Sequence, residues 1–448
     1  MAERDERREA ELREQIRVLS AEAATLDRRL QSEFPKYGGL VATTAVPADE
    51  IIALLRPGEA VVHLLAAEEA TFVFLISAQG VIRGHKVDLS TEQLHQLVAQ
   101  MRRELDPSRG LQPFDLRLPY QLYAWLLGPL DADLAAVEHL IFVLTGPLLS
   151  LPPAVLVREA PGSAQDYQSA AWLVRDFAVS VLPSVGALRQ LRAVVGESAA
   201  PDPFLGIGDP SFRGAVDDHR ALQSLQEAAS QCLEGELIDP SMLGALAPLP
   251  ETRDELLKIA TSLGAAGDSL VLGETASEAT VRTIDLSRYR VVAFATHGLL
   301  PNELRCQSEP SLVLTPPSVA SAAQDGLLAS SEIAQLVLDA DWALLSACNT
   351  AGPGGELGGE SLSGLARAFF YAGTRAVLVS HWPVDSQATV ILTTGTFEHY
   401  ASSASDGKAE ALRQAELALL SQPSTAHPAR WAPFVLVGDG GPRAAPGA

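Results

Sequence analysis

The sequence predicts an α/β protein: a three-layer α/β/α sandwich around a mainly parallel sheet, preceded by an N-terminal helix of coiled-coil type. From about residue 50 onward, segments with strand and helix character alternate along the chain. Several strands, such as 139–144 and 290–295, are apolar at nearly every position, as in sheets buried on both faces. Residues 3–33 contain no Gly or Pro and repeat apolar residues at helical spacing.

Length and composition limit the class of protein. At 448 residues the chain is longer than one ordinary domain, and a length of this kind predicts roughly two to four domains. Hydrophobic residues make up 47% and charged residues 20%, which is typical of a folded globular chain. The net charge of −22 argues against nucleic acid and anionic lipid as partners, since an acidic surface repels phosphate. We expect a cytoplasmic protein, because the charged N-terminus is no signal peptide and no stretch reaches about 18 apolar residues.

The N-terminal segment 3–33 is predicted to form a single helix. Its apolar positions are spaced alternately by four and three residues, the pattern of a coiled-coil seam. About three heptads are short for an independent dimer, so two interpretations stay open: docking on the chain's own domain, and pairing with an activator or a second copy. The seam consists of Leu12, Ile16, Leu19, Ala23, Leu26 and Leu30.

The first half of the remaining chain is predicted to contain five strands and two helices. A hairpin joins the second strand to the third, and a Ser-Thr cap begins the first helix. The strands are 59–64, 71–77, 81–87, 139–144 and 177–182, and the helices are 91–105 and 185–195.

The second half repeats the alternation, and its last strand is expected to close the sheet. The strands are 204–208, 271–272, 290–295, 311–314, 342–347, 376–380 and 431–437. The helices are 251–263, 276–284, 330–336, 359–372, 387–400 and 408–420.

Two of the buried strands run directly into residues with reactive side chains. His297 follows strand 290–295, and Cys348 follows strand 342–347, 51 residues further on. Parallel strands present their carboxyl ends at one edge of a sheet, so both side chains are expected to emerge together. An imidazole can take the proton of a thiol and return it to a leaving amine. Gly298 and the N–H of Cys348 are placed to form an oxyanion hole.

Other chemistries lack their motifs. Three cysteines, Cys232, Cys306 and Cys348, are too few for a disulfide framework and suit a reducing compartment. With no CxxC and no HxxxH, no metal is predicted, and nothing indicates a cofactor. No GxSxG and no GxxxxGK[ST] occurs, so a serine hydrolase and a phosphate-binding loop are disfavoured. A lone cysteine or histidine is usually structural, but the pair at two strand ends favours catalysis.

A series of motifs lies in order between about residues 50 and 440. Upstream are Leu149-Ser-Leu-Pro-Pro153 and Trp172-Leu-Val-Arg-Asp-Phe177. Further motifs are Phe294-Ala-Thr-His-Gly298, Glu309-Pro-Ser-Leu-Val-Leu-Thr315, Asp325-Gly-Leu-Leu-Ala-Ser-Ser-Glu-Ile333 and Leu345-Ser-Ala-Cys-Asn-Thr-Ala351. The last are Gly359-Glu-Ser-Leu-Ser-Gly-Leu-Ala-Arg-Ala-Phe-Phe370, Gly373-Thr-Arg-Ala-Val-Leu-Val-Ser-His-Trp-Pro-Val384 and His427-Pro-Ala-Arg-Trp-Ala-Pro-Phe434. In these motifs the chain resembles the CHAT domain, a caspase-like protease domain related to separase and found widely in bacteria.

This resemblance implies a catalytic dyad of His297 and Cys348 and a division into two related caspase-like lobes. We expect a coiled-coil-like helix at 1–34, an inactive lobe at 38–198, an active protease lobe at 199–440 and a disordered tail at 441–448.

The predicted function is an intracellular cysteine endopeptidase that cleaves a protein partner in a bacterial defence or stress pathway. In relatives the targets include gasdermin-like effectors. One alternative is a catalytically silent scaffold assembled through the N-terminal helix, and another is an acyl transferase or ligase that uses the same dyad. Carboxylates near the site would favour a basic side chain in the substrate, although each alone is more simply a solvated or capping group. They are Asp325, Glu356, Glu360 and Asp385.

Overall fold

The computed structural model describes residues 45–107, 110–212, 238–244, 246–301, 303–304, 307–321, 323–347, 364–382, 386–403 and 406–442. The predicted helix at 3–33 and most of the predicted tail lie outside these residues. Among the helices that are described, none is both long enough and apolar enough to cross a membrane.

The first group contains the five predicted strands and both predicted helices, and it adds three α-helices that were not predicted. Helix α4 (Thr91–Leu105) begins where expected, because the Ser90 hydroxyl accepts from the Gln93 N–H and the Gln93 side chain accepts from the Ser90 N–H. The strands are β1 (Glu59–Ala66), β2 (Thr71–Ser77), β3 (Ile82–Val87), β4 (His139–Leu144) and β5 (Ala178–Leu182). The helices are α3 (Ala48–Leu54), α4 (Thr91–Leu105), α5 (Arg117–Leu126), α6 (Leu173–Asp176), α7 (Val185–Arg189) and η5 (Gln190–Val195).

The second group adds three short strands beside the main sheet. The strands are β6 (Asp202–Pro210), β7 (Leu270–Gly273), β8 (Tyr289–Ala295), β9 (Gly298–Leu299), β10 (Ser311–Val313), β11 (Leu327–Ala329), β12 (Trp342–Ser346), β13 (Ala376–Ser380) and β14 (Phe434–Gly438). The helices are α9 (Pro240–Gly244), α10 (Glu251–Ser262), α11 (Glu278–Thr283), α12 (Ser330–Ile333), α13 (Gly364–Ala372), α14 (Ser386–Ser402), α15 (Gly407–Leu420) and α16 (Pro428–Trp431).

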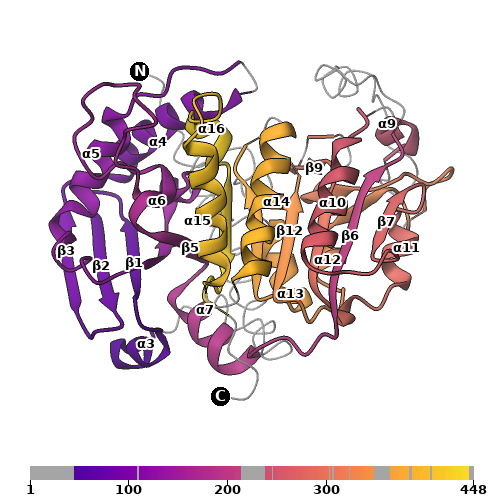
Figure 1. Cartoon of the computed structure of the whole chain (residues 1–448), viewed down its shortest axis with the longest axis horizontal. Helices are drawn as coiled ribbons and strands as arrows, with labels where there is room; N and C mark the ends of the chain where they lie inside the picture. The colour runs from indigo at the N-terminus through magenta and orange to yellow at the C-terminus, as the bar shows by residue number, and fades with distance from the viewer. Residues whose placement is uncertain are drawn as a thin grey trace, which may run out of the picture.

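One 11-stranded sheet runs through the described part of the molecule, in the order β3-β2-β1-β4-β5-β14-β13-β12-β8-β6-β7 (Figure 1). Its pairs are parallel except for the β1–β2–β3 meander and the β13–β14 pair. Helices α10, α14 and α15 lie in front of the sheet in Figure 1, and α13 packs on the other face through Phe369 against Phe294. The predicted α/β class with a mainly parallel sheet is confirmed.

The last strand departs from the prediction in its start and in its place. The expected strand 431–437 begins only at Phe434, because Pro428–Trp431 forms the short helix α16, capped by His427. Trp431 donates its indole N–H to the Ala426 carbonyl instead of joining the sheet. Strand β14 also does not close the sheet at an edge: it lies between β5, to which it is parallel, and β13, to which it is antiparallel. It therefore joins the two groups of strands.

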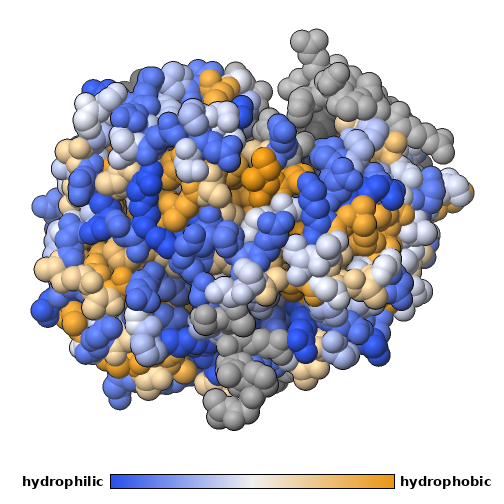
Figure 2. All heavy atoms as spheres, in the orientation of Figure 1, coloured by the Kyte–Doolittle hydropathy of each residue, from blue (hydrophilic) through white to orange (hydrophobic). Residues whose placement is uncertain are grey.

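The outer strands β1, β2 and β3 are not covered on both faces. The register places Leu65, Phe74 and Ile82 on one face, where they are 38%, 43% and 53% exposed. An apolar patch is visible over β1 and β2 in Figure 2. On the opposite face, Val73 and Leu75 are fully buried. The predicted covering of both faces therefore holds for the central strands, and this end of the sheet leaves one apolar face open.

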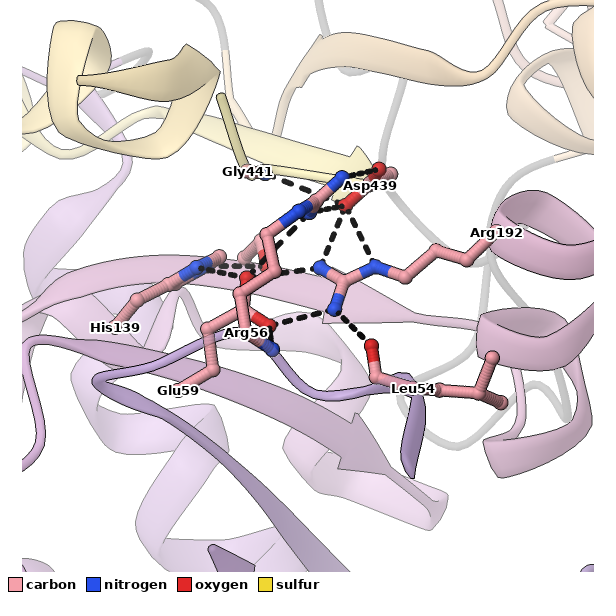
Figure 3. A network of polar contacts seen from close by, with 8 residues as sticks. Leu54, Arg56, Glu59, His139, Arg192, Asp439 and Gly441 are labelled. Carbon is pink, nitrogen blue, oxygen red and sulfur yellow. Dashed lines mark hydrogen bonds and ion pairs between the residues drawn. The ribbon is translucent and has the colours of Figure 1, made fainter. Parts of the chain in front are cut away.

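A buried ionic network connects the first strand to the end of the last (Figure 3). Arg192 of η5 contacts Glu59 of β1 through Nη1 at 2.5 Å and Nη2 at 2.8 Å, and its Nη2 lies 2.7 Å from an Asp439 carboxylate oxygen. Arg56 binds both oxygens of Asp439, at 2.8 and 3.0 Å. The His139 ring lies 3.4 Å from Glu59. Because every charge faces an opposite charge, burial of the network is tolerated.

A second small sheet lies beside the carboxyl end of β8, in the order β11-β10-β9. It has a separate apolar cluster, which includes Phe212, Leu243, Leu299 and Val313. Since β9 begins three residues after β8 ends, this cluster supports the segment that carries His297.

Candidate active site

The two strands that precede His297 and Cys348 are direct neighbours. β8 and β12 pair in parallel, and Ala295 is the Cα partner of Ser346. His297 comes two residues after Ala295, and Cys348 two residues after Ser346. Both therefore follow the same edge of the sheet at matching positions, as parallel strands with a common register require. Cys348 itself lies outside the described residues, whose run ends at Ala347.

The chain directly before Cys348 is held by three hydrogen bonds. The Thr296 N–H donates to the Ser346 carbonyl at 3.2 Å, and the Ser380 hydroxyl donates to the Ala347 carbonyl at 2.7 Å. On the face of the sheet that α10 covers, the Ser346 hydroxyl donates to Glu255 of α10 at 3.0 Å. All of these groups are buried, so solvent does not compete for the bonds. The end of β12 is therefore a rigid support.

His297 is half-buried and anchored through one ring nitrogen. Its Nε2 lies 2.9 Å from the Ala247 carbonyl oxygen, and its ring packs against Phe212 with centroids 5.3 Å apart. A carbonyl oxygen can only accept, so Nε2 carries the hydrogen. In the neutral imidazole, Nδ1 is then the nitrogen that can take up a proton. The contact with Ala247 therefore assigns the Nε2–H tautomer, in which Nδ1 is the basic nitrogen.

Gly298 lies at the start of β9 with its N–H directed away from β10. The Val313 N–H bonds to the His297 carbonyl at 2.9 Å, and the next pair along the ladder is Leu312 with Gly298. Hydrogen-bonded and non-hydrogen-bonded pairs alternate in antiparallel strands, so the Gly298 pair is of the second kind. Its N–H therefore points away from β10 and takes no part in that ladder.

Asp325 lies in the turn before β11, and its carboxylate serves that turn. One of its oxygens accepts from the Leu327 N–H at 2.9 Å. The N–H groups of Asp325 and Gly326 bind Glu278, at 2.9 and 2.6 Å. Burial raises the pKa of both carboxyls, that of Glu278 to about 7. These contacts match a capping carboxylate. The other three candidate pocket residues, Glu356, Glu360 and Asp385, lie outside the described residues.

Several groups around the site have no motif in the sequence. The Ala247 carbonyl belongs to a loop 50 residues before His297, and Glu255 sits on a helix that looks ordinary in sequence. Arg102 of α4 donates to the His381 carbonyl at 2.7 Å and lies over the Trp382 ring at 5.0 Å, three residues before Asp385. Only folding brings these groups to the site. In the described part of the chain, no cluster of His, Cys, Asp or Glu could hold a metal ion.

The chain is similar in sequence to two much longer proteins. The chain is 27% identical over 341 residues to tetratricopeptide repeat protein 28 of Mus musculus and 26% identical over 350 residues to that of Homo sapiens. Each match covers 71% of this chain but spans 13% of the relative.

The chain is also similar to solved structures, among them two that are each 10% identical in sequence. The Arg-specific cysteine proteinase gingipain R matches with a TM-score of 0.42, over 79% of this chain and 75% of that chain. The separase–securin complex of Saccharomyces cerevisiae matches with a TM-score of 0.46, over 87% of this chain and 31% of that chain.

A family profile covers most of the protein. The CHAT domain matches residues 117–439, which include β4, both strands that precede His297 and Cys348, and the joining strand β14. Because this match extends over more than half of the sequence, the chain belongs to the CHAT domain family.

Proposed function

We propose that the protein is a cysteine endopeptidase in which Cys348 is the nucleophile and His297 the general base. The observation that carries the proposal is the register of β8 and β12, which pairs Ala295 with Ser346, each two residues before one member of the proposed dyad. The Nε2 bond of His297 to Ala247 supports it, because Nδ1 is then the proton acceptor. Membership of the CHAT domain family agrees with this assignment.

The reaction would proceed in two steps, acylation of the Cys348 thiol and hydrolysis of the resulting thioester. His297 Nδ1 takes the Cys348 thiol proton, the sulfur attacks the scissile carbonyl carbon, and the Gly298 N–H helps to stabilise the oxyanion. The proton then passes to the leaving amine, the C–N bond breaks, and an acyl-enzyme thioester remains. Water attacks the thioester, giving up a proton to His297, and the acid product and the thiol are released.

Substrate choice is a separate part of the proposal. A basic side chain before the scissile bond would suit the candidate carboxylates Glu356, Glu360 and Asp385 better than Asp325, whose carboxylate already serves its own turn. Cleavage of a peptide library would test this, and a preference for acidic or apolar residues would contradict it. A protein substrate such as a gasdermin-like effector, a bacterial defence role, a cytoplasmic location and pairing through residues 3–33 stay predictions.

The direct test is the reactivity of the thiol. An ordinary thiol of pKa about 8.5 is only about 0.3% ionised at pH 6, so iodoacetamide labels it slowly there. We expect Cys348 to be labelled at pH 6 at least tenfold faster than Cys232 and Cys306, and His297→Ala to remove that advantage. Mass spectrometry of tryptic peptides gives all three rates in one sample.

His427→Ala is the matched control, because His427 is a buried histidine whose Nε2, like that of His297, contacts a backbone carbonyl, that of Gln112, at 2.8 Å. It should leave Cys348 labelling within twofold of the wild type. Equal and slow labelling of all three cysteines in the wild type would contradict the dyad.

A further inference from the structure

We propose that Glu255 is a positioning residue that holds, from the face of the sheet that α10 covers, the strand end leading into Cys348. Its carboxyl group lies between α10, β12 and α14: Oε2 accepts from the Ser346 hydroxyl at 3.0 Å, and Oε1 lies 2.7 Å from the Thr393 hydroxyl. Glu255 is 1% exposed and Thr393 fully buried. The inference rests on the proposed function, since it assigns Glu255 to the same site.

The hydrogen count around Thr393 indicates that this carboxyl is protonated. The Thr393 oxygen lies within hydrogen-bond distance of two acceptors, Glu255 Oε1 at 2.7 Å and the Thr389 carbonyl at 3.0 Å. A hydroxyl has one hydrogen and cannot donate to both. If Glu255 carries a proton, its O–H donates to Thr393, and Thr393 donates to Thr389. Every group is then satisfied, with Ser346 donating to the other carboxyl oxygen.

The surroundings favour the same state. Burial raises the pKa of Glu255 to about 7, against the opposing effect of the two hydroxyl hydrogen bonds. Glu251, one turn earlier on α10, raises it further. A neutral acid places no second negative charge beneath the strand end where a thiolate is to form, yet it offers both a donor and an acceptor. This combination suits a group that fixes position without electrostatic repulsion.

The hold extends to the nucleophile through a short, rigid path. Ser346 is two residues before Cys348, and its carbonyl is bound by Thr296, which is adjacent to His297. Glu255 therefore acts on the end of β12, which precedes Cys348 and is hydrogen-bonded to the residue beside His297. Loss of the carboxyl would free the Ser346 side chain and loosen the end of β12, and small displacements of a nucleophile reduce reactivity strongly.

The experiment measures iodoacetamide labelling of Cys348 at pH 6 together with amide hydrogen exchange of residues 342–347. Glu255→Leu keeps the volume but removes both hydrogen bonds, and we expect it to slow Cys348 labelling at least fivefold and to speed exchange. Glu255→Gln can accept from Ser346 and donate to Thr393, so it should stay within twofold of the wild type in both measurements.

Glu416→Gln is the matched control. Glu416 of α15 is also buried, at 3% exposure, with a pKa raised well above its usual range by burial, and α15 packs on the strands β5 and β14. This control should change neither Cys348 labelling nor exchange of 342–347. Wild-type labelling rates in Glu255→Leu would overturn the inference, as would equal slowing by Glu255→Gln and Glu255→Leu. A wild type whose labelling ignores His297 would instead overturn the proposed function, and the exchange data would still report on Glu255.

Discussion

Glu59 allows the strongest quantitative prediction, because its carboxylate is buried within the ionic network. Its side chain is 4% exposed, and Arg192 reaches both of its oxygens. Burial opposes ionisation, but hydrogen bonds from His139 and Arg192 outweigh it and lower the pKa of Glu59 from 4.5 to about 2. The perturbation is Glu59→Gln, which keeps the shape and removes the charge.

The magnitude follows from linkage. A group whose folded pKa lies below its unfolded value stabilises the fold at pH above the unfolded value, and this stabilisation is lost as pH falls through the folded one. A difference of about 2.5 pKa units corresponds to about 3 kcal/mol of unfolding free energy at pH 7. At pH 3, between the two pKa values, about 1.4 kcal/mol should remain. The wild-type advantage over Glu59→Gln should therefore shrink by about half on acidification.

Urea unfolding followed by circular dichroism, at pH 3, 4, 5 and 7, measures the difference directly. Urea is uncharged and does not screen the network. Glu159→Gln is the control, because Glu159 is exposed and should show little difference at any pH. A Glu59→Gln penalty that is independent of pH, or below about 1 kcal/mol at pH 7, would refute the reasoning.

Two further predictions concern stability elsewhere in the sheet and its helices. The free energy of unfolding of Glu255→Gln, relative to that of the wild type, should rise by about 2.5 kcal/mol between pH 5 and pH 8. The reason is that the pKa of Glu255 is raised in the folded state, so the wild type loses stability as pH rises from 4.5 to 7. The same difference between variant and wild type in urea unfolding at both pH values would contradict this. Gly373→Ala should destabilise by about 3 kcal/mol or more in the same assay, since φ is 115° and a Cβ would lie 2.2 Å from the Leu338 carbonyl oxygen. Gly395→Ala inside α14 meets only ordinary contact at 3.5 Å and should stabilise by about 1 kcal/mol; a loss at Gly395 as large as at Gly373 would show that the clash is not the cause.

Local sequence determined the elements of the sheet. The run 139–144 is buried at all six positions of β4, and 376–380 is buried throughout β13, as continuous apolar runs between turn residues predict. The Ser90 cap specified the start of α4. The sequence also indicated His297 as a candidate, because a histidine that follows a strand and precedes a glycine can be recognised from the sequence alone. The 431–437 strand was wrong at its start because Pro428 favours a helical turn, which periodicity does not detect.

Tertiary structure alone decided what surrounds those elements. Strand order is not encoded locally, so the insertion of β14 between β5 and β13 could not be predicted from its apolar run. The Ala247 carbonyl fixes the His297 tautomer through a backbone atom that every residue possesses, and so leaves no mark in sequence. Glu255 looks like any helical glutamate until packing removes its water and places it under Ser346. Burial of a strand follows from its local run of apolar residues and can be predicted from the sequence. The partners of a side chain and its protonation state depend instead on contacts between distant segments.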